Sequence, residues 1–413
     1  MDPGSAHGGL GKNHYIGKNG ALMINDITAF QGFMRACKAP GQACSSASLQ
    51  AVFSLPGDKL SWRFPEDVLA YFQPIYSVYQ ERIVAVEALA RVRASSGEVL
   101  QPMQFLPFLT LDQRRELSRQ MLVAGIALLE TLDAEGISLD LSFNVDPDFM
   151  EDQDCVPCFL GVLGSTTVSP QRITLELLES GDFLQGDIAV LRLQALRDTG
   201  AQIALDDIGS AYSSLLRLKN LPIQKIKLDQ ELVRDLDREP KIMAFLQSMK
   251  FLADGLGATL IVEGVETLTI LDAVAQLHQD LVQGYAISRP MPSDAFLVFV
   301  RDYVCPLVGS KPGSLLGAYA AHVLRRPLMH SLQHDHDTVA LTKFLENCPL
   351  LEYLRNHPSP VSAPVLDAYA ALLRGARDLP HVPLHQQITE AELQLQAILY
   401  DAIRAARHDV LGG

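Results

Sequence analysis

The sequence lacks the features of membrane and secreted proteins. No apolar run reaches the roughly 18 residues that a membrane-spanning helix needs, and no basic start leads into an apolar stretch with a small-residue cleavage site. Cysteine is sparse: the chain has six, and only Cys155 and Cys158 have the CxxC spacing. Without a second pair at zinc-binding spacing, these two favour small apolar residues one helical turn apart over a metal site. We therefore expect a cytoplasmic protein without a membrane span, in a reducing compartment.

Basic residues are also few. The chain has 34 Lys and Arg against 48 Asp and Glu, which gives a formal net charge of −14. This charge argues against binding to DNA or to an anionic membrane surface. An anionic substrate stays open if the binding site supplies its own positive charge.

What the sequence does have is a long alternation of strand-like and helix-like segments between about residues 70 and 300. Most strand candidates are continuous apolar runs, which is typical of strands covered on both faces. The first two are joined by a short turn and predict an antiparallel hairpin, whereas the others read as βα units. The fold class predicted is α/β: a modified (β/α)8 TIM-like barrel with an antiparallel first strand, plus a C-terminal all-helical region. A doubly wound open sheet is the competing architecture. The candidates are 71–78, 83–91, 137–145, 172–178, 202–207, 223–229, 259–265 and 281–287.

The pattern changes after Pro306, where four amphipathic segments punctuated by Pro and Gly predict helices at 315–332, 339–354, 364–376 and 388–410. The histidines of 330–336 could bind a metal, although polar loop histidines are far commoner. The predicted domains are an N-terminal extension, partly disordered, at 1–66, the barrel at 67–305, and the helical region at 306–413.

Polar side chains stand near the C-terminal ends of six successive strand candidates. In a barrel, this is the face where active sites are built. Helix capping could account for Asp229 or Glu266 taken singly. It does not account for acids inside apolar runs, where an unpaired charge is costly, so the set calls for a cation. The residues are Glu87, Asn144, Glu176, Glu179, Asp206, Asp207, Lys227, Asp229, Glu263, Glu266 and Gln283.

All the candidate ligands are oxygen donors, without His or Cys, which favours Mg²⁺ or Mn²⁺ over Zn²⁺. Their number suggests two ions, which could activate a water and stabilise the leaving oxygen in phosphoester cleavage. The adjacent Asp206 and Asp207 suit such a site because one carboxylate could bridge both ions. Lys227 could orient the attacking water or stabilise phosphate charge.

Seven motifs, in order from Tyr71 to Pro292, resemble the EAL family of bacterial phosphodiesterases, which linearise cyclic di-GMP. The resemblance implies a modified barrel, two Mg²⁺ or Mn²⁺ ions, pGpG as the product and frequent homodimerisation through the barrel. The motifs are 87-EALAR-91, 142-SFNVDP-147, 175-LELLES-180, 206-DDIGSAYSSL-215, 225-KIKLD-229, 263-EGVET-267 and 283-QGYAISRPMP-292.

The resemblance also implies roles for individual residues. Glu87, Asn144, Glu176 and Asp206 would hold the first metal; Asp206 and Asp207 would engage the second, with Glu263 nearby. Lys227 would contact the nucleophilic water, and Glu263 is the family's proposed general base. Arg91 would bind substrate phosphate, Gln73 and Gln283 would line the substrate cleft, and Glu179 would anchor the loop after Asp207.

Three positions depart from the usual DDFGTGYSSL loop, because Ile208, Ser210 and Ala211 replace Phe, Thr and Gly. Ala211 is the sharpest change, since Gly at such a turn often supplies positive φ. Two functions therefore stay open: an active hydrolase, and a cyclic di-GMP receptor that signals through its C-terminal helices. A purely structural barrel would have no reason to keep buried acids. We expect residues 306–413 to regulate the barrel or to bind a protein partner.

Overall fold

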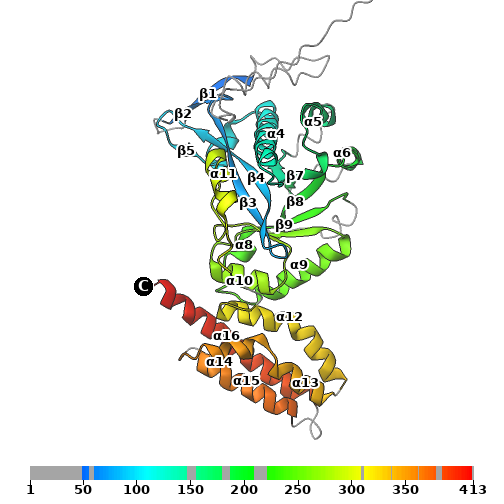
Figure 1. The fold of residues 1–413 in the computed structure, drawn as a ribbon, viewed down its shortest axis with the longest axis vertical. Helices are drawn as coiled ribbons and strands as arrows, with labels where there is room; N and C mark the ends of the chain where they lie inside the picture. Colours follow the sequence, from blue (N-terminus) through cyan, green and yellow to red (C-terminus); the bar gives the residue numbers. More distant parts are fainter. Residues whose placement is uncertain are drawn as a thin grey trace, which may run out of the picture. The chain divides into compact units, whose positions relative to one another are not determined.

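Figure 1 shows the computed structural model, which describes residues 49–54, 60–146, 155–178, 187–208, 221–307, 311–335, 337–360, 362–377 and 384–411. The chain divides into two compact units, Met1–Ala43 and Cys44–Gly413, and every described residue belongs to the second. Most of the predicted N-terminal extension lies outside the described residues. Its last part forms an antiparallel pair of strands, β1 (Ala51–Ser54) and β2 (Ser61–Phe64).

Eight strands of the described residues close into a barrel, as predicted. β3 pairs with both β4 and β11, so the described strands form a ring and not an open sheet. β3 is antiparallel to both neighbours, and every other pair in the ring is parallel. The ring contains β3 (Val68–Ser77), β4 (Arg82–Arg93), β6 (Asp140–Asn144), β7 (Ile173–Leu178), β8 (Gln202–Ile208), β9 (Lys225–Leu228), β10 (Thr259–Val262) and β11 (Leu281–Val282). Two short strands, β5 (Val99–Leu100) and β12 (Met291–Pro292), pair antiparallel with β4 and β3.

The last predicted strand, at 281–287, is much shorter than expected. β11 ends at Val282, and the chain then passes very close to the segment after β10. A Cβ at Gly284 would lie 2.2 Å from the carbonyl oxygen of Val265, so only glycine allows this approach. The apolar run that follows is therefore part of a loop packed onto the barrel end.

Helices surround the strands in the usual βα order (Figure 1). Residues 102–136 do not form one continuous helix, because Thr110 caps a new helix by accepting a hydrogen bond from the Gln113 backbone N–H at 3.3 Å. Cys155 and Cys158 lie one turn apart in α5, as expected. The helices are α3 (Pro102–Phe105), the 3₁₀ turn η1 (Leu106–Phe108), α4 (Leu111–Ala134), α5 (Cys155–Leu163), η3 (Pro170–Arg172), α6 (Asp187–Asp198), α8 (Gln230–Val233), α9 (Ile242–Leu256), α10 (Leu268–Gln276) and α11 (Ser293–Asp302).

Five helices, not four, follow in the described part of the C-terminal region. The predicted helix at 339–354 is split because Cys348 precedes Pro349 and is held in an extended conformation, with φ −77° and ψ 130°. Pro327 does not break the first helix. The helices are α12 (Leu315–His334), α13 (Thr338–Glu346), α14 (Pro349–Asn356), α15 (Ser362–Arg377) and α16 (Leu384–Leu411). No helix in the described ranges is both long and apolar enough to cross a membrane.

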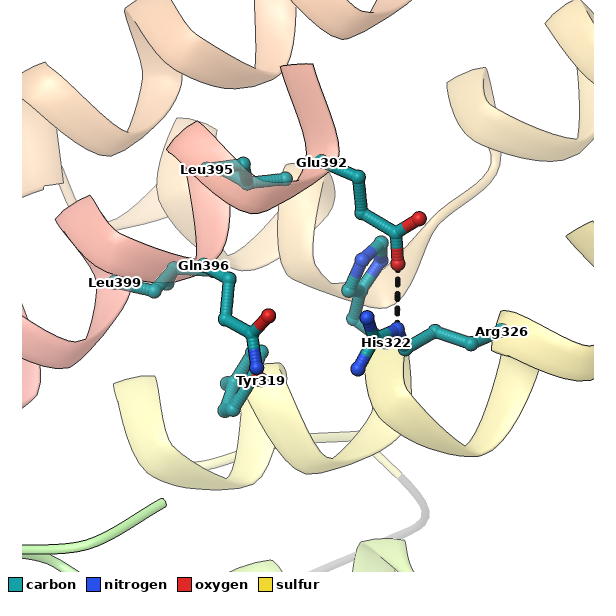
Figure 2. Close-up of a pocket in the computed structure, with 7 residues that line it drawn as sticks. All are labelled: Tyr319, His322, Arg326, Glu392, Leu395, Gln396 and Leu399. Carbon is teal, nitrogen blue, oxygen red and sulfur yellow. Dashed lines mark hydrogen bonds and ion pairs between the residues drawn. The ribbon is translucent and has the colours of Figure 1, made fainter. Parts of the chain in front are cut away.

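The seam between α12 and α16 contains a buried ion pair (Figure 2). The guanidinium of Arg326 donates to Glu392 at 2.5 Å, and the His330 ring lies 3.2 Å from the same carboxylate. Beside them, burial lowers the pKa of His322 to about 4, so this imidazole is neutral at pH 7. Glu392 therefore joins the last helix of the region to the first.

Candidate active site

Eight of the predicted polar residues meet at one end of the barrel: Glu87, Asn144, Glu176, Asp206, Asp207, Lys227, Glu263 and Gln283. Glu87 lies in the middle of β4, which is longer than expected, and the other seven stand in or just beyond the C-terminal halves of their strands. Asn144 donates to one oxygen of Glu87 at 2.8 Å, and Gln283 donates to the other at 2.7 Å. Residues from β6 and from just beyond β11 thus hold the carboxylate of β4 in place.

Lys227 is the centre of the site. Its side chain is 1% exposed, and four carboxylates surround its ammonium. Burial alone would lower the pKa of Lys227, but these carboxylates raise it well above its usual value. The distances from Lys227 Nζ are 2.7 Å to Glu263, 2.8 Å to Glu176, 3.3 Å to Glu87 and 3.5 Å to Asp206.

A bulge in β8 presents both aspartates to the same site. Neighbouring residues of a regular strand point to opposite faces, but the register with β9 shifts between Leu205 and Ile208. Asp207 has a φ of +60°, the left-handed conformation that Asp tolerates better than most residues. As a result, oxygens of Asp206, Asp207 and Glu263 lie within 4.8 Å of one another.

The site carries more negative charge than its one lysine can balance. Burial and neighbouring carboxylates raise the pKa of Glu263 to about 8 and that of Asp207 to about 6. The same two causes raise the pKa values of Glu176 and Asp206. Burial opposes ionisation of Glu87 too, but Lys227 and the hydrogen bond from Gln283 lower its pKa. A bound cation would relieve this excess.

The donors fit a divalent cation that prefers oxygen. Asp206, Asp207 and Glu263 are the only group of three or more His, Cys, Asp or Glu residues, within the described ranges, that come close enough together to hold an ion. Carboxylate oxygens are the ligands of Mg²⁺ and Mn²⁺. Of the four residues expected around a first ion, Glu87, Glu176 and Asp206 contact the Lys227 ammonium, and Asn144 donates a hydrogen bond to Glu87.

Comparison with known proteins identifies the family. The model of the EAL domain matches residues 66–290, more than half of the chain. The chain belongs to the EAL domain family. It is 32% identical over 229 residues to RocR of Pseudomonas aeruginosa and 26% identical over 240 residues to PdeR of Escherichia coli, both named cyclic di-GMP phosphodiesterases. These matches cover 55% and 58% of this chain, but only 58% and 36% of the relatives' own length.

Solved structures agree on the fold of the EAL domain. The PaMucR phosphodiesterase in complex with c-di-GMP is 26% identical, with a TM-score of 0.50 over 56% of this chain and 94% of that one. The EAL enzyme Bd1971 reaches a TM-score of 0.53 at 24% identity over 57% of this chain and 65% of that one, which supports the barrel fold alone.

The three expected substrate-binding residues of the EAL domain line one side of the site. Gln73 pairs with Glu87 across β3 and β4, and it accepts a hydrogen bond from Gln283 at 3.1 Å. Arg91 lies four residues beyond Glu87 on the same face of β4, is 6% exposed, and sits 5.7 Å from the ring of Tyr71. Gln73 and Gln283 are thus joined by a hydrogen bond, and Arg91 lies beside them on the face of β4 that carries Glu87.

Two features of the EAL domain site escaped the sequence reasoning. Ser142 donates a short hydrogen bond to Glu176, and its place two residues before Asn144 on the same face of β6 was the available signal. The guanidinium of Arg289 lies 3.9 Å over the ring of Tyr285, in the segment that follows Gln283. Only Tyr285 falls within the strand predicted at 281–287, so the sequence gave no reason to pair it with Arg289.

Other expectations for the EAL domain have mixed outcomes. Asp229 does cap a helix, accepting from the Glu231 backbone N–H at 2.8 Å, whereas Thr267 and not Glu266 caps α10. Asp146 forms an ion pair with Arg114 at 3.2 Å. Glu179 and residues 209–211 lie outside the described residues, as does His336.

Proposed function

We propose that this protein hydrolyses cyclic di-GMP to linear pGpG. The observation that carries the proposal is the buried Lys227 among four carboxylates contributed by β4, β7, β8 and the end of β10. In a barrel, this face is the catalytic one. Two EAL relatives that carry the name cyclic di-GMP phosphodiesterase support the choice of substrate.

In this proposal, the carboxylates and Asn144 would hold two Mg²⁺ or Mn²⁺ ions. Such ions supply an activated water and charge stabilisation of the leaving oxygen. The residues that would serve as ligands are Glu87, Asn144, Glu176, Asp206, Asp207 and Glu263. The bulge in β8 is what allows the adjacent aspartates to serve one site.

Side chains of the protein then orient the attacking water and the substrate and transfer protons. Lys227 keeps its ammonium at the site and donates hydrogen bonds toward the attacking oxygen or a phosphate oxygen. Glu263, whose carboxylate lies 2.7 Å from Lys227 Nζ, serves as the general base. Arg91 binds a phosphate, while Gln73 and Gln283 orient the substrate beside Glu87.

A second candidate is a cyclic di-GMP receptor with little or no turnover. The altered loop that begins at Ile208 favours it, because this loop directly follows the strained Asp207. If the loop positions Asp207 poorly, nucleotide could bind without being cleaved. The retained acids and Lys227 favour the enzyme.

We further propose that the barrel at 67–305 carries the chemistry and acts as a homodimer. Residues 306–413 then form a regulatory or partner-binding region, because they add helices without a further acidic cluster among the described residues. Size-exclusion chromatography with light scattering tests the dimer.

Purified full-length protein should be incubated with cyclic di-GMP in Mg²⁺, Mn²⁺ or EDTA, with product analysed by chromatography and binding by calorimetry. Metal-dependent pGpG is the expected result. Tight nucleotide binding without product would replace the enzyme with the receptor, and neither binding nor product would defeat both.

A further inference from the structure

A buried joint connects the barrel to the C-terminal helices. Asp272 of α10 is 3% exposed, and its carboxylate accepts hydrogen bonds from the Ser314 hydroxyl at 2.6 Å and the Gly313 backbone N–H at 3.1 Å. Ser314 is also the N-cap of α12 and accepts from the Gly317 backbone N–H at 3.0 Å. One hydroxyl thus joins the barrel carboxylate to the first turn of α12.

Gly317 makes the approach of the two helices close. A Cβ at this position would lie 2.0 Å from the nearer oxygen of Asp272, a distance that no side chain tolerates. Three residues therefore fit together at this point: the acid Asp272, the capping Ser314, and Gly317, which has no side chain. Because a buried carboxylate needs partners, each feature depends on the other two.

The joint lies inside a shared core. Residues 270–274 of α10 are all buried, as are residues 315–323 of α12. A helix that covers a barrel normally leaves one face in solvent, but here α12 packs on the outer side of α10 (Figure 1). A second link runs from Arg404 of α16 to the backbone carbonyl of Arg238, at 3.2 Å.

α10 leads directly to the site. Thr267 caps its start, and the four residues before Thr267 begin with Glu263. Within this link, the Val265 backbone N–H donates to the Gln283 carbonyl at 3.2 Å, and the Gln283 N–H donates to Val262 at 2.9 Å. A displacement of α10 would therefore move both Glu263 and Gln283, which contact Lys227 and Glu87.

We propose that Asp272 is a positioning residue through which the C-terminal helices set the geometry of Glu263 and Gln283. This inference rests on the proposed function of the site. Residues 306–413 can thereby influence the site: a displacement of the first turn of α12 displaces α10, and α10 displaces the residues 263–266 that include Glu263.

The test compares two Gly→Ala variants of the full chain. Gly317→Ala places a methyl group against Asp272, whereas Gly313→Ala, four residues earlier, would place it 3.9 Å from the same carboxylate, an ordinary contact. Hydrogen exchange of residues 263–276, Mn²⁺ affinity and steady-state turnover are measured for both. Ser314→Ala, which removes the bridging hydroxyl without adding atoms, is the second variant if Gly317→Ala does not fold.

We expect Gly317→Ala to speed exchange in α10 roughly tenfold and to lower Mn²⁺ affinity and kcat roughly tenfold to a hundredfold, as loss of a supporting shell does. Gly313→Ala should match the wild type. Removing the carboxylate as well, in Asp272→Ala with Gly317→Ala, should cost less than the sum of the single changes because the clash disappears.

Two results would overturn the inference: exchange, affinity and turnover equal to those of Gly313→Ala, or faster exchange with unchanged Mn²⁺ affinity and kcat, which would make the joint purely structural. A wild type without turnover would defeat the proposed enzyme, while exchange and Mn²⁺ affinity would still decide the role of Asp272.

Discussion

At the scale of single residues, the main feature of the site is an excess of buried negative charge. Lys227 stands among Glu87, Glu176, Asp206 and Glu263 and cannot neutralise all of them. Burial makes each unbalanced carboxylate more costly, so protons are retained where no other cation is present. The raised pKa values of Glu263 and Asp207 are the consequence.

This charge balance predicts how stability changes with pH. Burial raises the pKa of Glu263 from 4.5 to about 8, so its contribution to stability is fully present below 4.5 and is lost as the pH rises through about 8. Asp207, whose pKa is raised to about 6, acts in the same direction. The melting temperature of EDTA-treated protein should therefore fall between about pH 5 and about pH 8.

Glu263→Gln should flatten this pH dependence, and Glu98→Gln, at an exposed turn, should not. Because a divalent ion replaces the retained protons, Mn²⁺ should raise the melting temperature more at about pH 8 than at about pH 6. Equal stabilisation by Mn²⁺ at both values would contradict the assigned pKa directions. Differential scanning fluorimetry is sufficient for the comparison.

Most of the candidate site could be predicted at the residue scale, because strand ends in a barrel converge and oxygen donors imply a particular class of metal. That Lys227 would contact four carboxylates could not, since its side-chain direction depends on the closed barrel. Ser142 was missed for the same reason: a serine inside a strand has no distinctive pattern until Glu176 lies opposite it.

At the scale of elements, irregular backbone makes the site. The bulge in β8 turns Asp207 toward Asp206, and close backbone approaches after β10 and β11 carry Glu263 and Gln283 inward. Periodicity predicts where strands lie but not where they break, so 281–287 was predicted as a strand although β11 ends at Val282. The split between α13 and α14, by contrast, follows from Pro349 and was available in the sequence.

Gly264 offers a test of this irregular backbone. It has a φ of +68°, and a Cβ would lie 2.7 Å from the Gln230 Cα. Gly264→Ala should destabilise the fold by about 1–3 kcal/mol and reduce turnover through its neighbour Glu263. Chemical denaturation and a cyclic di-GMP assay measure the two effects.

Gly255→Ala is the matched control. Gly255 lies in α9 with nothing within 4 Å of the added Cβ, so this change should stabilise the protein by about 0.5–1 kcal/mol. If the two variants proved equally stable, the backbone at Gly264 would not be constrained as described.

At the scale of the whole molecule, the barrel and its antiparallel first strand followed from the short first turn and the repeated βα pattern. The packing of the last helices on the barrel could not be predicted from the sequence, because an amphipathic pattern shows that a helix has a buried face but not which surface that face contacts. Asp272 has no distinctive sequence pattern, because Ser314 and Gly317 lie against it only in the folded chain.

Truncation after Cys305 should therefore damage the barrel itself. Loss of α12 would expose the outer side of α10 and leave Asp272 without its partners at Gly313 and Ser314. We expect a lower melting temperature, aggregation and weaker Mn²⁺ binding than in the full chain. A truncated barrel with the stability and metal response of the full chain would show that residues 306–413 are an independent domain.

The most direct measurement is conversion of cyclic di-GMP to pGpG by the full chain with Mg²⁺ or Mn²⁺, alongside Glu87→Gln and the control Glu98→Gln. Glu87 is held by Lys227, Asn144 and Gln283, whereas Glu98 is exposed. The account predicts metal-dependent product from the wild type and Glu98→Gln, and at least a roughly hundredfold loss in Glu87→Gln. Full activity of Glu87→Gln, or product formation in EDTA, would contradict it.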